Sequence, residues 1–302
     1  MNLEKINFKG WENCLKLSNG EAELVISVGL GPRILSYRRV NGVNFMKNFD
    51  EQLADIRKDE WQSYGGHRLW HAPEVFPRTY YPDVEPVKSD WNGRVLRLQC
   101  VVESTTGLQK EIEIELAESG TEVKLCQRIF NRNPWAVTFA PWGLSVMAPG
   151  GTAIVPQEPF VPHGAGEGES FEYARPLVLW KFTNMADPRF VWGKKYIRMR
   201  QDDRFESKQK FGGTIKAAWA GYALDKEIFL KHFEYDPNAI YPDGGCNAEF
   251  FTMPGFLEIE SLGPLAAVEP GAYTELNESW RIVPFTLTDS DDAVSEQLKG
   301  LI

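Results

Sequence analysis

The chain has 302 residues, 43% of them hydrophobic and 13% aromatic, and a formal net charge of -9. A chain of this length can bury a large core, so its stability requires no disulfide or metal staples. Because the balance is acidic and basic residues do not cluster, we expect no nucleic-acid partner. No apolar run reaches membrane-spanning length and no secretory signal begins the chain, so we expect a cytoplasmic protein without membrane contact.

Alternation of apolar and polar residues with a period of two dominates the chain and predicts strands. In the first part we expect strands over Glu23–Ser27 and Arg33–Arg39, then a short helix over Asp50–Lys58. Tight-turn signals such as Asn92-Gly93 separate the next strands. These four successive strands are expected to form an antiparallel meander: Arg94–Glu103, Gln109–Leu116, Glu122–Asn131 and Ala136–Met147.

The second half continues the strand pattern after a long Gly- and Pro-rich segment, residues 148–176, which we interpret as a loop over a sheet. The later expected strands are Leu177–Phe182, Tyr196–Arg200, Ile215–Leu224, Ile228–Tyr235, Glu249–Thr252, Phe256–Leu262 and Tyr273–Val283. A C-terminal helix is expected at about 290–301, capped by Ser290. Many strands with few helices predict an all-β fold, a large antiparallel two-sheet β-sandwich that occupies residues 1–302 as one domain.

The segment from Ser63 to Glu74 carries the most polar chemistry in the smallest space. Behind a Gly-Gly bend it holds His67, Arg68, Trp70, His71 and Glu74. Imidazole exchanges protons near neutral pH, guanidinium fixes hydroxyls through a planar fork, and indole offers a flat face to a sugar ring. An ordinary polar loop is the alternative interpretation of the same residues.

A metal site at this segment is not expected. His67, His71 and Glu74 have a spacing that would suit zinc on a helix. The Gly-Gly bend and Pro73 oppose a helix, and Arg68 stands where zinc hydrolases place their glutamate. No phosphate loop, dinucleotide fingerprint or CxxC pair is present either, so we expect no metal and no cofactor.

A strand at Phe256–Leu262 would place Glu258 and Glu260 on one face and Leu257 and Ile259 on the other. Neighbouring carboxylates raise each other's pKa, so one could act as a general base near neutral pH. A solvated strand face is the alternative.

Four further residues are candidates for binding a ligand. Asp243 and Asn247 flank a second Gly-Gly turn, although turn formation alone would explain Asp243. His163 lies in the long loop, where simple exposure is the alternative. Trp142 could offer a flat face to a pyranose, although most tryptophans of a β-sandwich belong to the core.

Four segments together give the chain a resemblance to the galactose mutarotase-like superfamily, which includes aldose 1-epimerases. They are Gly31-Pro-Arg-Ile34, Gly65-Gly-His-Arg-Leu-Trp70, Trp142-Gly-Leu-Ser-Val-Met147 and Leu257-Glu-Ile-Glu-Ser261. The resemblance implies a β-supersandwich with a sugar site on a concave face, and ring opening by an acid–base pair. It also implies that Glu260 is the general base and that Arg68 positions the sugar.

One departure from the family pattern concerns the catalytic acid. The family's mid-chain histidine has no counterpart between Asn131 and Gly143. We therefore expect His67 to act as the acid, with His71 second and His163 as a further source. The expected function is mutarotase-like chemistry on a free sugar or sugar acid, by a monomer or a homodimer. A carbohydrate-binding protein without turnover is the second hypothesis, and a glycosidase or lyase that uses Glu258 and Glu260 is the third.

Overall fold

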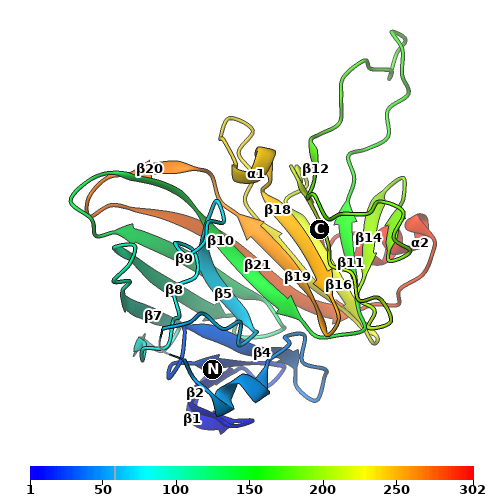
Figure 1. The fold of residues 1–302 in the computed structure, drawn as a ribbon. Coiled ribbons are helices and arrows are strands. Elements are labelled where there is room, and N and C mark those ends of the chain that lie inside the picture. The colour runs from blue at the N-terminus through cyan, green and yellow to red at the C-terminus, as the bar shows by residue number, and fades with distance from the viewer. Residues whose placement is uncertain (58) are drawn as a thin grey trace.

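Two large antiparallel sheets form the protein (Figure 1), as the alternating sequence predicts. The computed structural model describes residues 1–57 and 59–302. In spatial order the 11-stranded sheet contains β1 (Asn2–Phe8), β2 (Trp11–Ser18), β3 (Ala22–Ser27), β4 (Arg33–Arg39), β5 (His67–Ala72), β10 (Val137–Met147), β19 (Phe256–Leu262), β18 (Ala248–Met253), β15 (Gln209–Gly213) and β12 (Leu177–Leu179), with β20 (Ala266–Val268) paired to β10.

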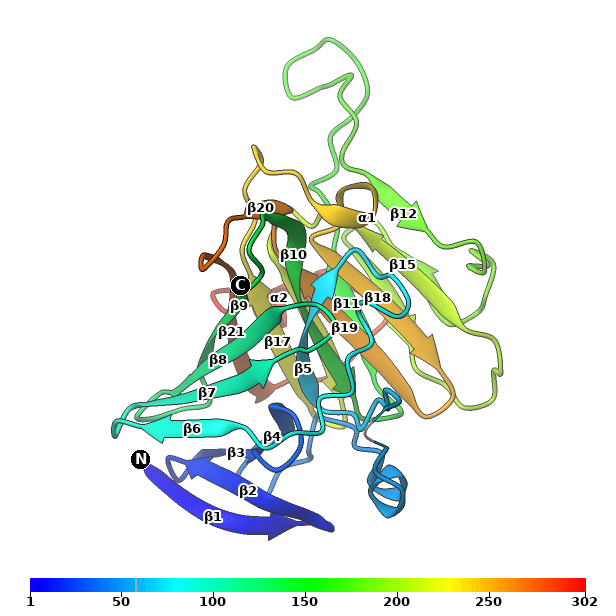
Figure 2. The ribbon, with the colours of Figure 1, turned by 60° about the vertical axis from the view of Figure 1, so that its left-hand side comes forward.

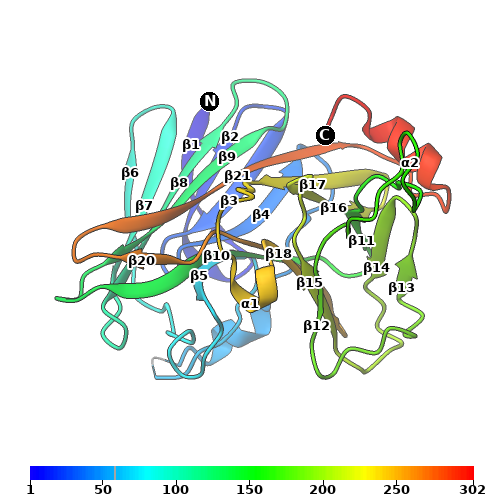
Figure 3. The same cartoon turned by 90° about the horizontal axis from the view of Figure 1, so that it is seen from above.

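The second sheet has 10 strands and packs against the first. Its spatial order is β13 (Phe190–Trp192), β14 (Tyr196–Arg200), β11 (Thr152–Pro156), β16 (Trp219–Leu224), β17 (Glu227–Phe233), β21 (Tyr273–Pro284), β9 (Val123–Asn131), β8 (Leu108–Leu116), β7 (Val95–Val102) and β6 (Lys88–Trp91). Seen from above, β17 and β21 of this sheet run beside β10 and β18 of the other (Figure 3).

A continuous apolar core fills the space between the sheets, because strands place alternate side chains on opposite faces. Leu257 and Ile259 of β19 lie in this core, as expected, together with Phe229 of β17 and Trp280 of β21. The other face of β19 carries the glutamates. The alternation predicted for this strand is therefore confirmed.

Helices are few and short. The expected helix at Asp50–Lys58 is a 3₁₀-helix over Asp50–Ala54, and Lys58 lies outside the described residues. The C-terminal helix α2 spans Asp291–Leu298, and the Ser290 hydroxyl accepts a hydrogen bond from the Ala293 amide at 3.2 Å, as a helix N-cap does. In the described part of the chain, no helix combines the length and apolarity needed to cross a bilayer.

Two expectations about the strands are wrong. The meander holds for β7, β8 and β9, but β10 joins the other sheet between β5 and β19. Almost every residue of β10 is buried, which is typical of a central strand covered on both faces. The segment after the Gly-Gly bend is strand β5 rather than a loop, and all six of its residues are buried.

Residues 157–176 leave the sheets between β11 and β12 and project from the molecule (Figure 1). The loop expected over residues 148–176 is confirmed only in part: Thr152–Pro156 form the buried strand β11, and residues 157–176 extend away from the sheet rather than over it. Viewed after a 60° turn, the same segment stands clear of β15, β18 and β19 (Figure 2).

Candidate active site

Five adjacent strands, β5, β10, β19, β18 and β15, build the outer face of the larger sheet where the predicted residues gather. Their register places Leu144 of β10 opposite both Arg68 of β5 and Glu260 of β19, and Glu260 opposite Glu249 of β18. Residues directly opposite in antiparallel strands share a face. A cross-strand row therefore brings together side chains that are far apart in sequence.

The Gly-Gly bend determines how β5 enters this row. Gly65 and Gly66 have φ values of 80° and 70°, a region that favours glycine. A Cβ atom at Gly66 would lie 2.6 Å from the Ile34 carbonyl oxygen, so the chain has no room for a side chain there. The bend thereby allows β5 to pair with β4 through Ile34 and His67 and to continue along β10.

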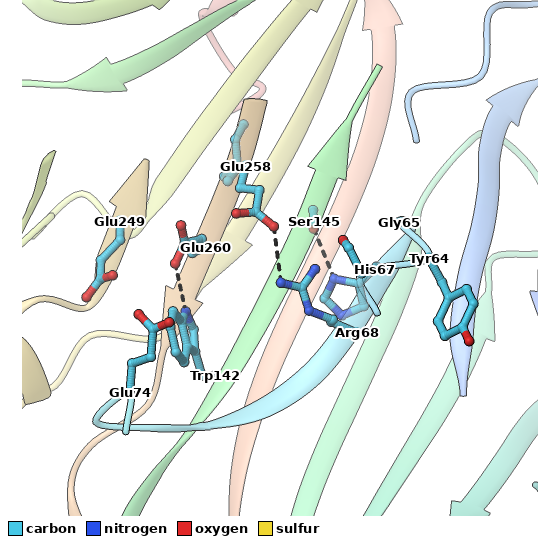
Figure 4. A network of polar contacts seen from close by, with 12 residues as sticks. Tyr64, Gly65, His67, Arg68, Glu74, Trp142, Ser145, Glu249, Glu258 and Glu260 are labelled. Carbon is cyan, nitrogen blue, oxygen red and sulfur yellow. Dashed lines mark hydrogen bonds and ion pairs between the residues drawn. The ribbon is translucent and has the colours of Figure 1, made fainter. Parts of the chain in front are cut away.

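A cleft of about 510 Å³ opens over these strands, and Figure 4 shows part of its wall. Side chains of both charges and several aromatic rings surround it. Its lining includes Trp61, Arg68, Trp70, Glu74, Tyr80, Trp142, Trp180, Lys208, Lys210, Phe251, Phe256, Glu258 and Glu260. Polar groups between flat apolar rings are the composition expected for a site that binds a small polar ligand.

Glu260 is the most constrained acid of the cleft, with 1% of its surface exposed. Its Oε2 atom accepts hydrogen bonds from Trp142 Nε1 at 3.0 Å and from Lys210 Nζ at 3.2 Å. Lys210 also lies 2.7 Å from Glu249 Oε2. One ammonium group therefore joins two buried carboxylates on neighbouring strands.

Burial and mutual charge determine which of Glu260, Glu249 and Lys210 hold a proton. Burial raises the pKa of Glu260, and it raises the pKa of Glu249 to about 8, although Lys210 opposes both shifts. Burial lowers the pKa of Lys210, but the two carboxylates together raise it above its usual value. At neutral pH the lysine is therefore charged and Glu249 largely holds its proton.

A second ion pair forms the neighbouring part of the wall. Arg68 donates to Glu258 at 3.2 Å, and the guanidinium lies 4.5 Å from the centre of the Trp70 ring. Arg68 is 3% exposed, and its Nε and NH1 atoms have no hydrogen-bond partner among the described residues. Both atoms are fully buried, so neither reaches the surface of the cleft.

The expected meeting of Glu260 with His67 is wrong. His67 and Arg68 are neighbours on β5, so their side chains point to opposite faces of the sheet. The His67 side chain points into the core (Figure 4). Its Nδ1 lies 3.0 Å from Ser145 Oγ, and its Nε2 lies 2.8 Å from Gln127 Oε1. Burial lowers the pKa of His67 to about 4, so it is a neutral structural residue at pH 7.

His71 lies four residues further along β5, an even number, and therefore on the same inward face as His67. Burial, with the nearby Lys110 and Arg78 charges, lowers its pKa to about 3. Neither histidine of the bend reaches the cleft. His163 is exposed in the projecting loop, where its ring packs edge-on against Phe171, and it does not line the cleft.

The remaining candidates divide between the cleft and its supports. Trp70, Trp142 and Glu74 line the cleft, as expected, and Glu74 accepts a hydrogen bond from Tyr80. Asn247 does not: its side chain holds the backbone of Ile215 through hydrogen bonds of 2.6 and 3.1 Å.

Asp243 lies in the short turn α1 (Pro242–Gly245) with φ at 51° and does not line the cleft. Burial raises the pKa of its carboxyl group. The structure therefore places Asp243 outside the lining of the cleft.

Three important groups of the site have no clear signal in the sequence. Lys210 carried no signal, because its partners come from strands 39 and 50 residues away. Glu249 was ambiguous at the start of its strand. Trp61 precedes the bend and gave no indication that its ring would cover Trp70, at 5.1 Å between centres. Among residues 1–57 and 59–302, no three side chains of the metal-binding kinds converge.

A separate polar cluster supports the cleft floor from inside the sandwich. Lys231 lies 3.3 Å from Glu278 and donates to the carbonyls of Gly143 at 2.9 Å and Ile259 at 3.3 Å. Glu278 in turn accepts a hydrogen bond from Ser261. The buried ion pair therefore ties β10 and β19 together directly beneath the cleft.

The fold and the cleft define a two-sheet β-supersandwich with a polar and aromatic site on the outer face of one sheet. Solved structures share this architecture. A galactose mutarotase-like protein from Lactobacillus casei ATCC 334 aligns with a TM-score of 0.55 at 9% identity, over 90% of this chain and 100% of that one. A candidate aldose 1-epimerase from Escherichia coli K12 gives 0.55 at 12%, over 89% and 98%.

A galactose mutarotase related enzyme from Lactobacillus acidophilus gives a TM-score of 0.54 at 9% identity, over 92% of this chain and 99% of that one. No protein-family model matches the chain, and no curated protein matches it. The chain therefore has the galactose mutarotase-like fold, as the sequence resemblance implies. At these identities the likeness describes the fold and leaves the activity to be argued from the cleft.

Proposed function

We propose that the cleft binds a free aldose or sugar acid and interconverts its anomers by acid–base ring opening. The observation that carries this proposal is the convergence of Glu260, Glu258 and Arg68 with several indole rings in one cleft. Carboxylate and guanidinium groups suit sugar hydroxyls, and the rings suit the C–H face of a pyranose.

Glu260 is the proposed general base. It must be ionised to accept a proton from the anomeric hydroxyl, and Lys210 favours that charged form against the effect of burial. Trp142 and Lys210 both donate to its Oε2 atom and so fix the direction of the carboxylate. Arg68, held by Glu258 and stacked near Trp70, is the proposed group for orienting the sugar.

Exchange between α and β anomers, measured by NMR, tests the proposal. The wild-type protein should accelerate exchange of at least one sugar in a panel of neutral aldoses and uronic acids. Glu260→Gln should lower this rate ~10²–10⁴-fold, the usual contribution of a general base. Glu269→Gln, which changes an exposed carboxylate outside the cleft, is the matched control. Wild-type exchange in the Glu260→Gln protein would refute Glu260 as the base.

A carbohydrate-binding protein without turnover is the second candidate. The observation that favours it is the inward direction of His67 and His71, which leaves the cleft without a histidine acid among the described residues. Calorimetry would then detect sugar binding while anomer exchange stayed at the rate of buffer alone.

A further inference from the structure

Among the described residues that line the cleft, Lys210 is the ionisable nitrogen base that contacts the proposed general base Glu260 directly. Its Nζ lies 2.7 Å from Glu249 Oε2 and 3.2 Å from Glu260 Oε2, and 8% of the side chain is exposed. A lysine ammonium has three N–H donors. Two of them are directed to these carboxylates, so the third remains for a ligand in the cleft.

Aromatic rings limit where that third donor can point. The Lys210 ammonium lies 4.6 Å from the centre of the Trp180 ring and 5.3 Å from that of Trp142. Both rings line the cleft. A pyranose resting against either ring would bring its ring atoms near the ammonium.

Glu260 complements this arrangement. Its Oε2 atom is occupied by Trp142 and Lys210, whereas Oε1 has no hydrogen-bond donor among the described residues. Oε1 is not fully buried, and Glu260 lines the cleft, so this oxygen reaches the cleft surface. The same carboxylate therefore bonds the lysine through one oxygen and presents the other to a ligand.

We propose that Lys210 is the catalytic acid of the ring opening and works with Glu260 as one proton-exchanging pair. This inference rests on the proposed function and supplies the acid that the histidines do not provide. Lys210 is placed by Glu249 on one side and by Glu260 on the other, so Glu249 is a positioning residue.

The proton balance closes within the pair. Glu260 takes the proton of the anomeric hydroxyl, whose O–H electrons form the C1=O1 bond. The C1–O5 bond breaks, its electron pair goes to O5, and O5 takes a proton from Lys210. Reclosure on the other face of the aldehyde runs these steps backwards: the neutral lysine takes the proton from O5, Glu260 returns its proton to O1, and both groups are restored.

The charges of the pair favour this sequence. Burial alone lowers the pKa of Lys210, and its carboxyl neighbours raise it, Glu260 most of all. When Glu260 accepts the anomeric proton its charge disappears, and this part of the upward shift disappears with it. Lys210 therefore becomes a stronger acid at the moment when the ring oxygen becomes a stronger base.

Three substitutions of Lys210 test the assignment by anomer exchange. Lys210→Met removes the acid, and Lys210→Arg keeps the charge but cannot lose a proton in a protein. Both should lower kcat ~10²-fold or more while changing KM only a few-fold. Lys210→Ala should recover part of the rate when ethylamine is added, and the recovery should grow with amine concentration. Lys88→Met, on exposed edge strand β6, is the matched control.

The outcomes separate this inference from the proposed function. If Glu260→Gln abolishes exchange while Lys210→Met or Lys210→Arg retains the wild-type kcat, the proposed function stands and the lysine assignment falls. If the wild-type protein accelerates no sugar of the panel, both fall. Lys210→Met leaves two carboxyls without their cation, so the Glu249→Gln/Lys210→Met double variant decides the question if the single variant does not fold.

Discussion

Glu249 gives the sharpest thermodynamic prediction, because burial beside Glu260 raises its folded-state pKa from 4.5 to about 8. Between those two values the folded protein holds a proton that the unfolded chain has released. Stability from this group is therefore complete below about pH 4.5 and is lost as the pH rises through 8. Replacing the acid by Glu249→Gln removes this dependence, because an amide does not titrate.

The magnitude follows from the two pKa values. Between pH 6 and pH 8 the linkage relation predicts that the wild-type protein loses about 2 kcal/mol relative to Glu249→Gln, at about 1.36 kcal/mol for each fully effective pH unit. Urea denaturation at pH 6, 7 and 8 measures the difference through the midpoint at unchanged slope. The Glu269→Gln control should follow the wild type at every pH.

Parallel curves for the wild type and Glu249→Gln would refute the reasoning. They would mean that Glu249 is ionised throughout, so that Lys210 is neutralised by two carboxylates rather than largely by Glu260. That result would require a different assignment of protons to the groups of the cleft.

The other predictions concern the inner face of the same strands and the groups already assigned to catalysis. Burial lowers the pKa of His67 to about 4, so the folded protein loses stability as the pH falls below about 6.5, where the unfolded chain takes up a proton. Between pH 6.5 and pH 5 the free energy of unfolding should fall by about 2 kcal/mol relative to His67→Gln, as measured by urea denaturation. Gly143→Ala should cost about 1–3 kcal/mol in the same assay, because its Cβ would overlap Glu278 Oε1. Glu260→Gln and the Lys210 series should lower anomer exchange as described above.

Much of the fold follows from period-two alternation. The bounds of β4, β14 and β19 match the sequence prediction, and the shared face of Glu258 and Glu260 follows directly from strand geometry. Strand β5 was harder, because His67 and His71 alternate with Arg68 and Trp70 and give no apolar face. Glycines and a proline at its ends also indicated a loop.

The site was only partly predictable, for a reason that lies in β-sheet pairing. Local sequence determines which residues of one strand share a face, but the register between strands far apart in the chain determines which acids and bases meet. Local patterns made Glu260, Arg68 and Trp142 candidates, and the family resemblance implied roles for Glu260 and Arg68. Lys210 was not found, because nothing near it in sequence shows that β15 lies beyond β18 in the sheet.

The two faces of β19 explain why the predicted histidine acid is wrong although the outer face still offers a proposed acid–base pair. Ile259 and Ser261 face the inner cluster of Lys231 and Glu278, whereas Glu260 faces Lys210 in the cleft. Each face carries its own lysine–glutamate pair, separated by the thickness of one sheet. The inner pair is sealed and fastens the strands, so His67 beside it serves the same structural purpose. The outer pair lines the candidate cleft, and the proposed proton exchange with a ligand is therefore assigned to Lys210 and Glu260.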